Sequence, residues 1–322
     1  MTSKDVVAGL VTPIVIITST LSYAALIFSG PLAQGLPIGI GFSLIGAGVM
    51  AILFAWRSGV PFAIAGPDSK PVAVLATLSA TLAADLVRGG HAAQAPVTVM
   101  AALVAGTLVV GVALYLLGNL EAGRWIRFVP YPVIAGFMAA SGWLLAVGGI
   151  RLAIGTHVSL ELLEQLADGQ HIVQLAVVLV FVIAMVLTKR VNHPLAFPAL
   201  LVVGTLAAHL VLHGAGYSIA SARGAGWFLD LSSGAAHPGP WLLKSLPQID
   251  LPALLWAAGG FVALITVTAM TLLMSVMAVE VETRLDVDLD RELRLNGIAN
   301  ILVGLGGGMV GTLSLSFEPH PV

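Results

Sequence analysis

Long apolar runs follow one another along this chain and limit what it can fold into. Residues 6–27, 134–154 and 254–278 are examples, and a helix of about twenty apolar residues crosses a hydrocarbon core of about 30 Å. The chain is 58% hydrophobic and only 9% charged, whereas a soluble domain is about one quarter charged. The runs lack the alternation of a membrane β-strand. The sequence therefore predicts an all-α polytopic membrane protein.

Hydropathy places nine expected spans along the sequence. They lie near residues 6–28, 37–56, 69–86, 96–117, 130–153, 171–188, 195–213, 253–279 and 293–309. A polar segment rich in Gly, Ser and Pro separates the seventh span from the eighth. We therefore expect seven spans within residues 1–213, an extramembrane loop over residues 214–252, and further spans within residues 253–322.

The distribution of Lys and Arg predicts the orientation in the membrane. With the N-terminus inside, nine Lys and Arg residues fall on inner segments and four on outer loops, and Lys70 completes the 14. Cytoplasmic segments carry the excess of these residues. We expect a multi-pass protein of the plasma (inner) membrane with a cytoplasmic N-terminus.

Several functional classes have no support in the sequence. Cysteine is absent and the net charge is −2, so disulfide chemistry and nucleic-acid binding are not expected. His209 and His213 lie four residues apart but have no carboxylate nearby, which disfavours a metal site. No acid, base and nucleophile converge in any motif, so we expect no enzyme, no catalytic residue and no cofactor.

The stretch AGPDSKPVAVLA, residues 65–76, interrupts the apolar pattern. Gly and Pro before Asp68 cannot continue a helix, whereas Ser69 is a good N-cap and Pro71 suits a first helical turn. We therefore expect a discontinuous helix over residues 72–86 that begins inside the membrane. The alternative is an ordinary loop whose Asp68 and Lys70 face cytoplasmic water.

A helix that begins inside a membrane offers a site for an anion. Its free N–H groups and its dipole attract negative charge, and broken helices hold substrate in many transporters. The candidate contacts are Ser69, Lys70, Pro71, Val72 and Ala73. The Lys70 ammonium adds a positive charge, or alternatively pairs with Asp68. We expect Asp68 to act as a cap or gate partner, because a carboxylate repels an anion.

Three segments together resemble the sulfate permease (SulP) family of anion transporters. They are AGPDSKPVAVLATLSATLA at residues 65–83, RFVPYPVIAGFMAASGWLLAVGGI at residues 127–150, and DLDRELRLNGIANILVGLGGGMVGTLSLS at residues 288–316. They are similar to the third helix, the fifth-helix signature, and the ninth helix with its flanking segments, in the family's order.

The resemblance implies fourteen spans in two inverted repeats of seven. Half-helices three and ten would face each other across the anion, helices one and eight would flank it, and a core group would move against a gate group. Residues 1–213 would form the first repeat and residues 253–322 part of the second. The sequence ends near the expected start of the tenth helix, at residues 311–316, and lacks the cytoplasmic STAS domain that many members carry. We therefore expect a truncated transporter.

Helices one and eight supply further candidate residues for the anion. Tyr23 and Thr20 lie three residues apart, so one helix face can present both hydroxyls; alternatively, such hydroxyls bond their own helix. Several family members carry an acid in the middle of helix eight, where this chain has Met270 or a neighbouring threonine, such as Thr268 or Thr271. The two threonines are candidate anion contacts, and the missing acid argues against sodium or proton coupling at that position.

The sequence thus predicts a secondary transporter of inorganic anions, with sulfate first and bicarbonate or chloride open. The expected partners are a small inorganic anion and the lipid bilayer, and a homodimer is plausible for such a transporter. Two alternatives remain open. One is a nucleobase-type permease of the same fold, and the other is a non-transporting membrane fragment or subunit.

Overall fold

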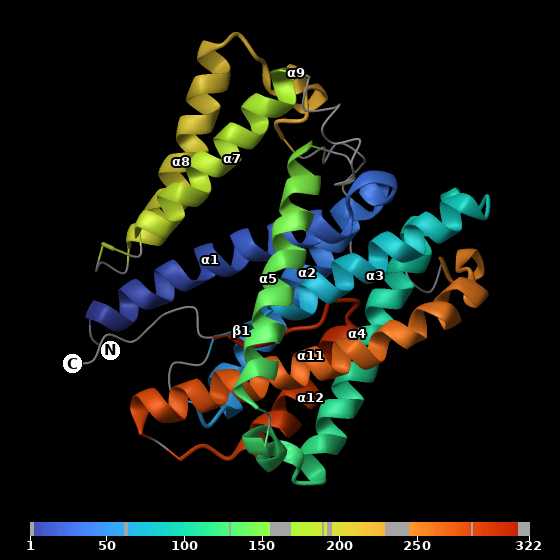
Figure 1. The fold of residues 1–322 in the computed structure, drawn as a ribbon, viewed down its shortest axis with the longest axis vertical. Coiled ribbons are helices and arrows are strands. Elements are labelled where there is room, and N and C mark those ends of the chain that lie inside the picture. The colour runs from blue at the N-terminus through green and yellow to red at the C-terminus, as the bar shows by residue number, and fades with distance from the viewer. Residues whose placement is uncertain are drawn as a thin grey trace. The chain divides into compact units, whose positions relative to one another are not determined.

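The computed structural model describes residues 3–60, 64–128, 130–154, 169–188, 190–191, 195–228, 245–284 and 286–314. Most of these residues are helical (Figure 1). The α-helices are α1 (Ser3–Ile27), α2 (Leu36–Arg57), α3 (Ser69–Arg88), α4 (Ala95–Asn119), α5 (Tyr131–Ile154), α7 (Gly169–Thr188), α8 (Ala196–Gly214), α9 (Ile219–Gly224), α11 (Leu251–Thr283) and α12 (Leu289–Leu305). The short 3-10 helices are η1 (Gly30–Gly35), η2 (Ala92–Gln94), η3 (Ala122–Phe128) and η4 (Leu246–Gln248), and the strands are β1 (Ile64–Gly66) and β2 (Thr312–Ser314).

The predicted spans are confirmed as helices. Each expected span coincides with one observed helix, and the ends differ by a few residues. Within the described residues, seven helices are long and apolar enough to cross a membrane. The apolar part of α1 is shorter, Thr12–Ile27, and α12 has 17 residues. The predicted tenth helix runs into residues 315–322, and part of the predicted loop covers residues 229–244; both stretches lie outside the described residues.

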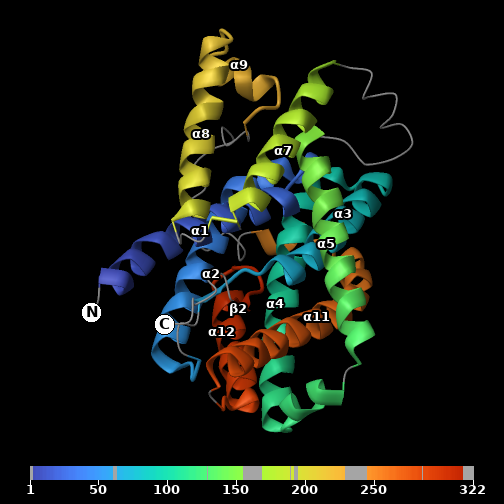
Figure 2. The same ribbon diagram turned by 60° about the vertical axis from the view of Figure 1, so that its left-hand side comes forward.

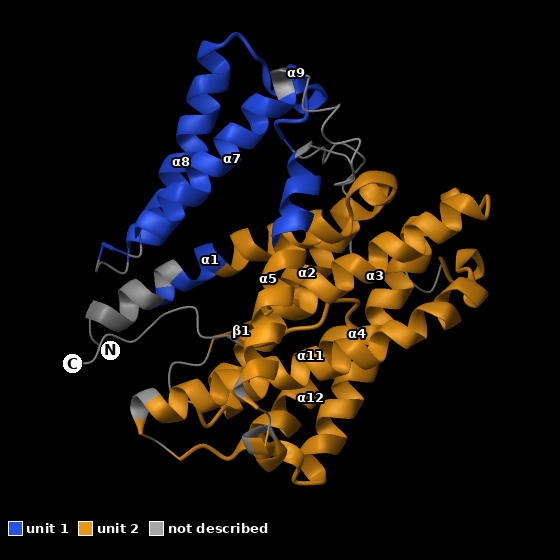
Figure 3. Cartoon of the chain, viewed as in Figure 1, with its two compact units in different colours: residues 1–15, 146–232 blue, residues 16–145, 233–322 orange. Residues whose placement is uncertain are grey.

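The chain forms two compact units, coloured separately in Figure 3. The first contains residues 1–15 and 146–232, and the second contains residues 16–145 and 233–322. In the first unit α7 packs against α8, and a side chain at Gly204 would overlap the Phe181 ring. This division follows contacts, whereas the predicted repeats follow sequence order, so the repeat assignment stays a prediction.

Helix α4 forms the centre of the second unit. It packs against α3, α11 and α12, and α12 lies alongside it in both views (Figures 1 and 2). Two glycines allow this approach: a Cβ on Gly297 would lie 2.5 Å from the Tyr115 backbone nitrogen, and one on Gly111 would lie 2.7 Å from that of Ile301. The backbones of α4 and α12 therefore meet directly, as small residues permit in membrane helices.

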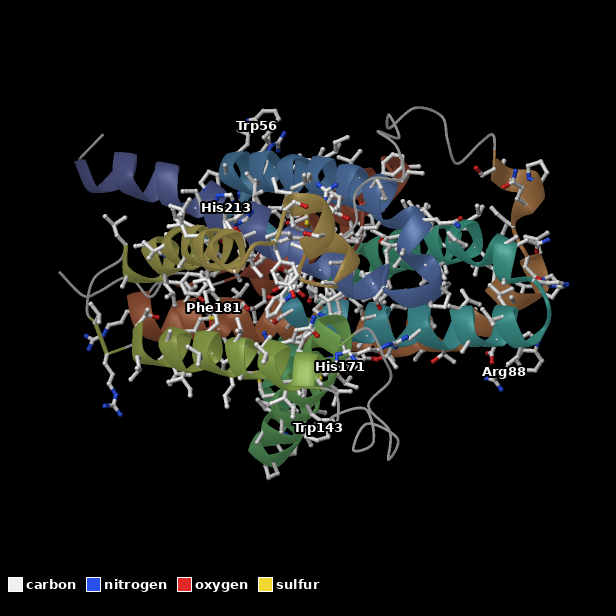
Figure 4. The ribbon with its side chains drawn as sticks, turned by 90° about the horizontal axis from the view of Figure 1, so that it is seen from above. Trp56, Arg88, Trp143, His171, Phe181 and His213 are labelled. Carbon is white, nitrogen blue, oxygen red and sulfur yellow. The ribbon has the colours of Figure 1, made fainter. Side chains whose placement is uncertain are left out.

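The outer surface of the second unit is apolar, as a bilayer requires. Trp56 on α2 is 73% exposed and Trp143 on α5 is 70% exposed. Figure 4 shows the side chains on these helices, with Arg88 at the tip of α3. Large apolar side chains in contact with lipid are the expected counterpart of long apolar spans.

Polar contacts gather at the helix ends of the second unit that the topology predicts on the inner side. The fully buried Glu292 carboxylate accepts hydrogen bonds from the Gly59 N–H at 2.7 Å and the Ser58 hydroxyl at 3.0 Å. Asp290 accepts from the Gly123 N–H at 2.7 Å. Arg294 donates to a carbonyl at the end of α4. These contacts join the end of α2, the end of α4 and the start of α12.

The predicted outer side of the same unit has its own polar contacts. Asp250 caps α11 by accepting from the Ala253 N–H at 3.0 Å, and its other oxygen lies 2.6 Å from Nδ1 of His91, which follows α3. Its backbone N–H donates to the Thr98 hydroxyl on α4. Segments that the sequence assigns to one side of the membrane thus meet at one end of the unit, which supports the predicted alternation of spans.

The structure adds a two-stranded sheet that the all-α prediction did not include. Strand β1, just before α3, pairs in antiparallel fashion with β2, which follows α12. Gly66 lies opposite Thr312, and Ala65 lies opposite Leu313. Three-residue strands carry no alternation long enough to detect in a sequence, and their pairing joins segments far apart in the chain.

Candidate functional site

The junction of β1 and α3 is the centre of the candidate site. Asp68, in extended conformation, caps α3: its Oδ1 accepts from the Lys70 N–H at 3.0 Å, and its carbonyl accepts from the Val72 N–H at 3.1 Å. The prediction that Ser69 caps a helix starting at residue 72 is therefore wrong. The helix begins at Ser69, because a carboxylate one residue earlier is an equally good cap. The structural role expected for Asp68 is confirmed.

Burial distinguishes the two interpretations of this segment. Asp68 is only 6% exposed, and the first turn of α3 contains the buried residues Pro71, Val72 and Ala73. The Lys70 side chain is 21% exposed. A loop in cytoplasmic water would leave Asp68 exposed. The segment is instead a helix start packed inside the second unit. Helix α3 has 20 residues and is one of the seven helices, among the described residues, that are long enough to cross a membrane, so its predicted start inside the membrane stays a prediction.

The donors at this helix start are fewer than the sequence suggested. The Lys70 N–H is taken by Asp68, Pro71 has no N–H, and the Val72 N–H is bonded to the Asp68 carbonyl. Ala73 lies one turn into the helix. The remaining donors are the hydroxyl and first-turn N–H of Ser69, which has no partner within the helix by its position, and the Lys70 ammonium. That ammonium lies 3.6 Å from the Asp68 carboxylate, so the expected ion pair is present.

Helix α1 contributes a second wall. The Tyr23 hydroxyl lies within hydrogen-bonding reach of the Ser69 side chain and close to the Asp68 carboxylate. Thr20, one turn earlier, is fully buried, and its hydroxyl has no hydrogen-bond partner among the described residues. A Cβ on Gly66 would lie 3.8 Å from Ile16. Residues 16, 20 and 23 share one face of a helix, so this face is directed at the start of α3.

Helix α11 contributes the third wall. It packs against both α3 and β2. Thr268 is fully buried and donates to the Leu264 carbonyl at 2.7 Å, whereas Thr271 is 1% exposed and its hydroxyl has no partner among the described residues. The two threonines predicted to contact the anion therefore differ. The Thr268 hydroxyl is bonded within its own helix, and the Thr271 hydroxyl is unpaired among the described residues.

The depth of Thr271 matches the start of α3. Helices α3 and α11 run in opposite directions, because His91 after α3 binds Asp250 before α11, and Gly260 adjoins Leu78. At 1.5 Å per residue, Ser69 lies about 14 Å along α3 from that contact and Thr271 about 16 Å along α11. The unpaired hydroxyl therefore lies at nearly the same level as Ser69.

Glu280 has a structural position. Its Oε1 accepts the Val287 N–H at 3.1 Å and so closes the turn between α11 and α12. This contact gives Glu280 a structural role at the end of α11. Within the described ranges, no group of three or more His, Asp or Glu residues is arranged to hold a metal ion.

Sequence reasoning missed the polar residues that hold β2. Asn296 and Asn300 on α12 are fully buried. Asn300 bonds the Gly311 backbone just before β2, and Asn296 bonds the Thr312 hydroxyl within β2. The signal was present in the sequence, because two amides four residues apart in an apolar helix must share one face and find polar partners.

A separate groove of about 540 Å³ lies between the end of α3 and the start of α11. Leu82, Asp85, His91, Asp250 and Trp256 are among its lining residues. Asp85 is sixteen residues beyond Ser69, or about 24 Å along the helix. The groove is therefore distinct from the site at the helix start.

Comparisons with known proteins give one family and one fold. The model of the sulfate permease family matches residues 3–317. The structure resembles the transmembrane domain of a cyanobacterium bicarbonate transporter, BicA, with a TM-score of 0.64 and 20% identity over 94% of this chain and 73% of that chain. A comparison with curated protein sequences finds no match. At this level of identity the structural likeness shows the fold.

Proposed function

Because the chain belongs to the sulfate permease family, we propose that it carries a small inorganic anion across the membrane by alternating access, with sulfate as the first candidate. The chain is a multi-pass membrane protein of a family of inorganic anion transporters, which are not enzymes. Bicarbonate is the second candidate, because the structurally similar BicA domain belongs to a bicarbonate transporter.

One observation carries the proposed site. Two buried hydroxyls lack partners among the described residues, those of Thr20 and Thr271. Thr271 lies on α11, which packs against α3, and Thr20 lies on α1, whose Ile16 and Tyr23 approach Gly66 and Ser69. An unpaired buried hydroxyl costs about 1–3 kcal/mol, and an oxyanion at the helix start would satisfy it. The positive end of the α3 dipole, the Ser69 donors and the Lys70 ammonium favour the same ligand.

The hydrogen bonds already made within the site help to assign a role to each residue. Ser69, Lys70, Tyr23 and Thr271 are the proposed anion contacts. Thr268 would have to give up its helix bond to reach an anion, so we assign it a smaller contribution. Pro71, Val72 and Ala73 form the buried first turn that aims the dipole rather than donating hydrogen bonds.

The site favours an anion over a nucleobase. The acid at the helix start, Asp68, is already engaged by the Lys70 N–H and ammonium. Both contacts involve one oxygen of Asp68, Oδ1. The Lys70 charge beside it attracts an anion and offers a neutral base no such attraction. The ion pair with Asp68 also leaves the Lys70 charge partly compensated, which suits an anion that must be released as well as bound.

The remaining expectations on coupling and assembly stay proposals. The middle of α11 presents threonines instead of an acid, so we propose transport without sodium or proton coupling at that position. We propose a plasma-membrane protein with a cytoplasmic N-terminus, as the distribution of Lys and Arg in the sequence predicts. A homodimer is proposed only by analogy with such transporters.

Uptake into liposomes tests the proposed function. The purified chain is reconstituted, and entry of radiolabelled sulfate is measured with bicarbonate and chloride as competitors. Saturable uptake that falls in Tyr23→Phe, which keeps the ring and removes the hydroxyl, is expected. Absence of uptake by wild-type protein that elutes as a monodisperse species would refute the proposal and support a non-transporting subunit.

A further inference from the structure

Two buried amides on α12, those of Asn296 and Asn300, are hydrogen-bonded to each other and to the chain at the start of β2. Asn300 Oδ1 accepts from the Gly311 N–H at 3.0 Å, and Asn300 Nδ2 donates to the Gly311 carbonyl at 2.9 Å. A single side chain thus binds both polar groups of one residue, as a neighbouring strand would. Asn296, Asn300 and Thr312 are all fully buried.

Asn296 supports the orientation of that amide. Its Oδ1 accepts from Asn300 Nδ2 at 2.7 Å, and its own Nδ2 lies 3.4 Å from the Thr312 hydroxyl. If the Asn300 amide were reversed, its Oδ1 would face Asn296 Oδ1 at 2.7 Å, and two acceptors would be in contact. The Asn296 backbone carbonyl also accepts from Asn300 Nδ2, at 2.9 Å. Asn296 therefore supports the one orientation of the Asn300 amide that matches the N–H and carbonyl of Gly311.

The backbone at Gly311 and Thr312 is in direct contact with the segment that leads into α3. Thr312 pairs with Gly66 across the sheet, and a Cβ on Gly311 would lie 2.6 Å from the Gly66 carbonyl oxygen. Gly66 stands two residues before Asp68, the cap of α3. The position of Gly311 therefore sets the position of the helix start.

We infer that Asn300, oriented by Asn296, is a positioning residue that sets the geometry of the anion site from a distance. Asn300 bonds Gly311, which directly precedes β2. Strand β2 pairs with β1, and β1 leads into Asp68 and Ser69 at the start of α3. An apolar side chain could fill the same space, but only an amide offers one donor and one acceptor matched to a peptide group. The effect on anion affinity rests on the proposed function; the effect on the sheet does not.

A disulfide reporter tests the effect on the sheet without transport. The chain has no cysteine, so Ala65→Cys with Leu313→Cys places two thiols opposite each other in the antiparallel pair. Opposite Cβ atoms in such a pair are about 5 Å apart, close enough for a disulfide. Membranes carrying this pair are oxidised briefly with copper phenanthroline, and the rate of cross-linking is measured.

The reporter is then combined with Asn300→Asp, which keeps the acceptor and removes the donor. Cross-linking at least tenfold slower is expected, because the carboxylate repels the Gly311 carbonyl and Asn296 Oδ1. The matched control is Thr107→Val, since Thr107 is also fully buried but bonds only its own helix. Asn296→Ala is the milder second variant if Asn300→Asp does not accumulate, and it should slow cross-linking severalfold.

Sulfate uptake by the same two asparagine variants, without the cysteines, separates positioning from stability. The expected result is a KM about tenfold higher with a similar amount of folded protein, whereas Thr107→Val keeps the wild-type KM. Wild-type cross-linking in the asparagine variants would overturn the inference, and so would slowed cross-linking with an unchanged KM. If wild-type protein shows no uptake, the proposed function fails, and cross-linking alone decides whether Asn300 sets the sheet.

Discussion

Replacing Thr271 by valine should stabilise the empty protein and weaken its hold on the anion. Valine keeps the shape of threonine and removes the hydroxyl. In the structure this hydroxyl is buried, with 1% of the residue exposed, and it has no partner among the described residues. A stabilising substitution that damages function is the mark of a group retained for a ligand.

The structure sets the size of both effects. Leaving a buried polar group unpaired costs about 1–3 kcal/mol, so removing it should raise the free energy of unfolding by about 1 kcal/mol or more. A hydrogen bond to a charged ligand contributes about 1.5–3 kcal/mol. Since about 1.4 kcal/mol corresponds to a factor of ten in affinity, Thr271→Val should weaken anion binding about 10- to 100-fold.

Thermal unfolding in detergent, followed by tryptophan fluorescence, measures both effects together. Without anion, Thr271→Val should unfold at a higher temperature than wild type. With increasing sulfate, the wild-type midpoint should rise, because a ligand that binds only the folded state stabilises it, and the variant should need much more sulfate for the same rise. In the control, Thr107→Val, the lost hydroxyl donates only to the Leu103 carbonyl, so the response to sulfate should be that of wild type.

Two results would refute this reasoning. A lower unfolding temperature for Thr271→Val without anion would mean that the hydroxyl has a stabilising partner. An unchanged sulfate response in Thr271→Val would mean that this hydroxyl does not contact the anion, even if the site lies elsewhere along α3.

Three further predictions concern the helix crossing, an internal carboxylate and the site charge. Gly297→Ala places a Cβ 2.5 Å from the Tyr115 backbone and should cost about 1–3 kcal/mol, whereas Gly259→Ala meets nothing within 4 Å and should be neutral or stabilising; unfolding temperatures check both. Burial raises the pKa of Glu292 above its ordinary value of 4.5, so the folded state favours the protonated form and loses stability as pH rises from that value; Glu292→Gln should therefore gain stability over wild type as pH rises above about 4.5 in thermal scans, and a pH-independent difference would contradict this. Lys70→Ala should lower sulfate uptake at a given concentration, and an unchanged affinity and rate would remove Lys70 from the site.

The spans were predictable because they depend on local composition. A bilayer requires about twenty apolar residues for each helix, and charges or turn residues mark the ends. A helix start shortly after Pro67 was predictable for the same reason, since Gly66 and Pro67 forbid a continuous helix. Its cap was assigned one residue late, because Asp68 and Ser69 are equally good N-caps and the sequence does not show which one is extended.

The two-stranded sheet and its hydrogen bonds to Asn296 and Asn300 were not predictable from local patterns. Strands β1 and β2 have three residues each, too few to show alternation, and their pairing is between segments far apart in the chain. Asn296 and Asn300 were visible as polar residues in an apolar helix, but their partners lie eleven or more residues later. The unpaired state of the Thr20 and Thr271 hydroxyls likewise depends on what packs around them, which only the fold determines.

The most direct test of the account is whether an anion binds at the start of α3. Equilibrium binding of radiolabelled sulfate to purified protein is measured for wild type, Ser69→Ala and Thr81→Ala. Thr81 lies on the same helix, and its hydroxyl bonds only the Thr77 carbonyl. The account predicts saturable binding by wild type and Thr81→Ala, with at least tenfold weaker binding by Ser69→Ala. Equal affinity in all three proteins would contradict it and place any anion site away from this helix start.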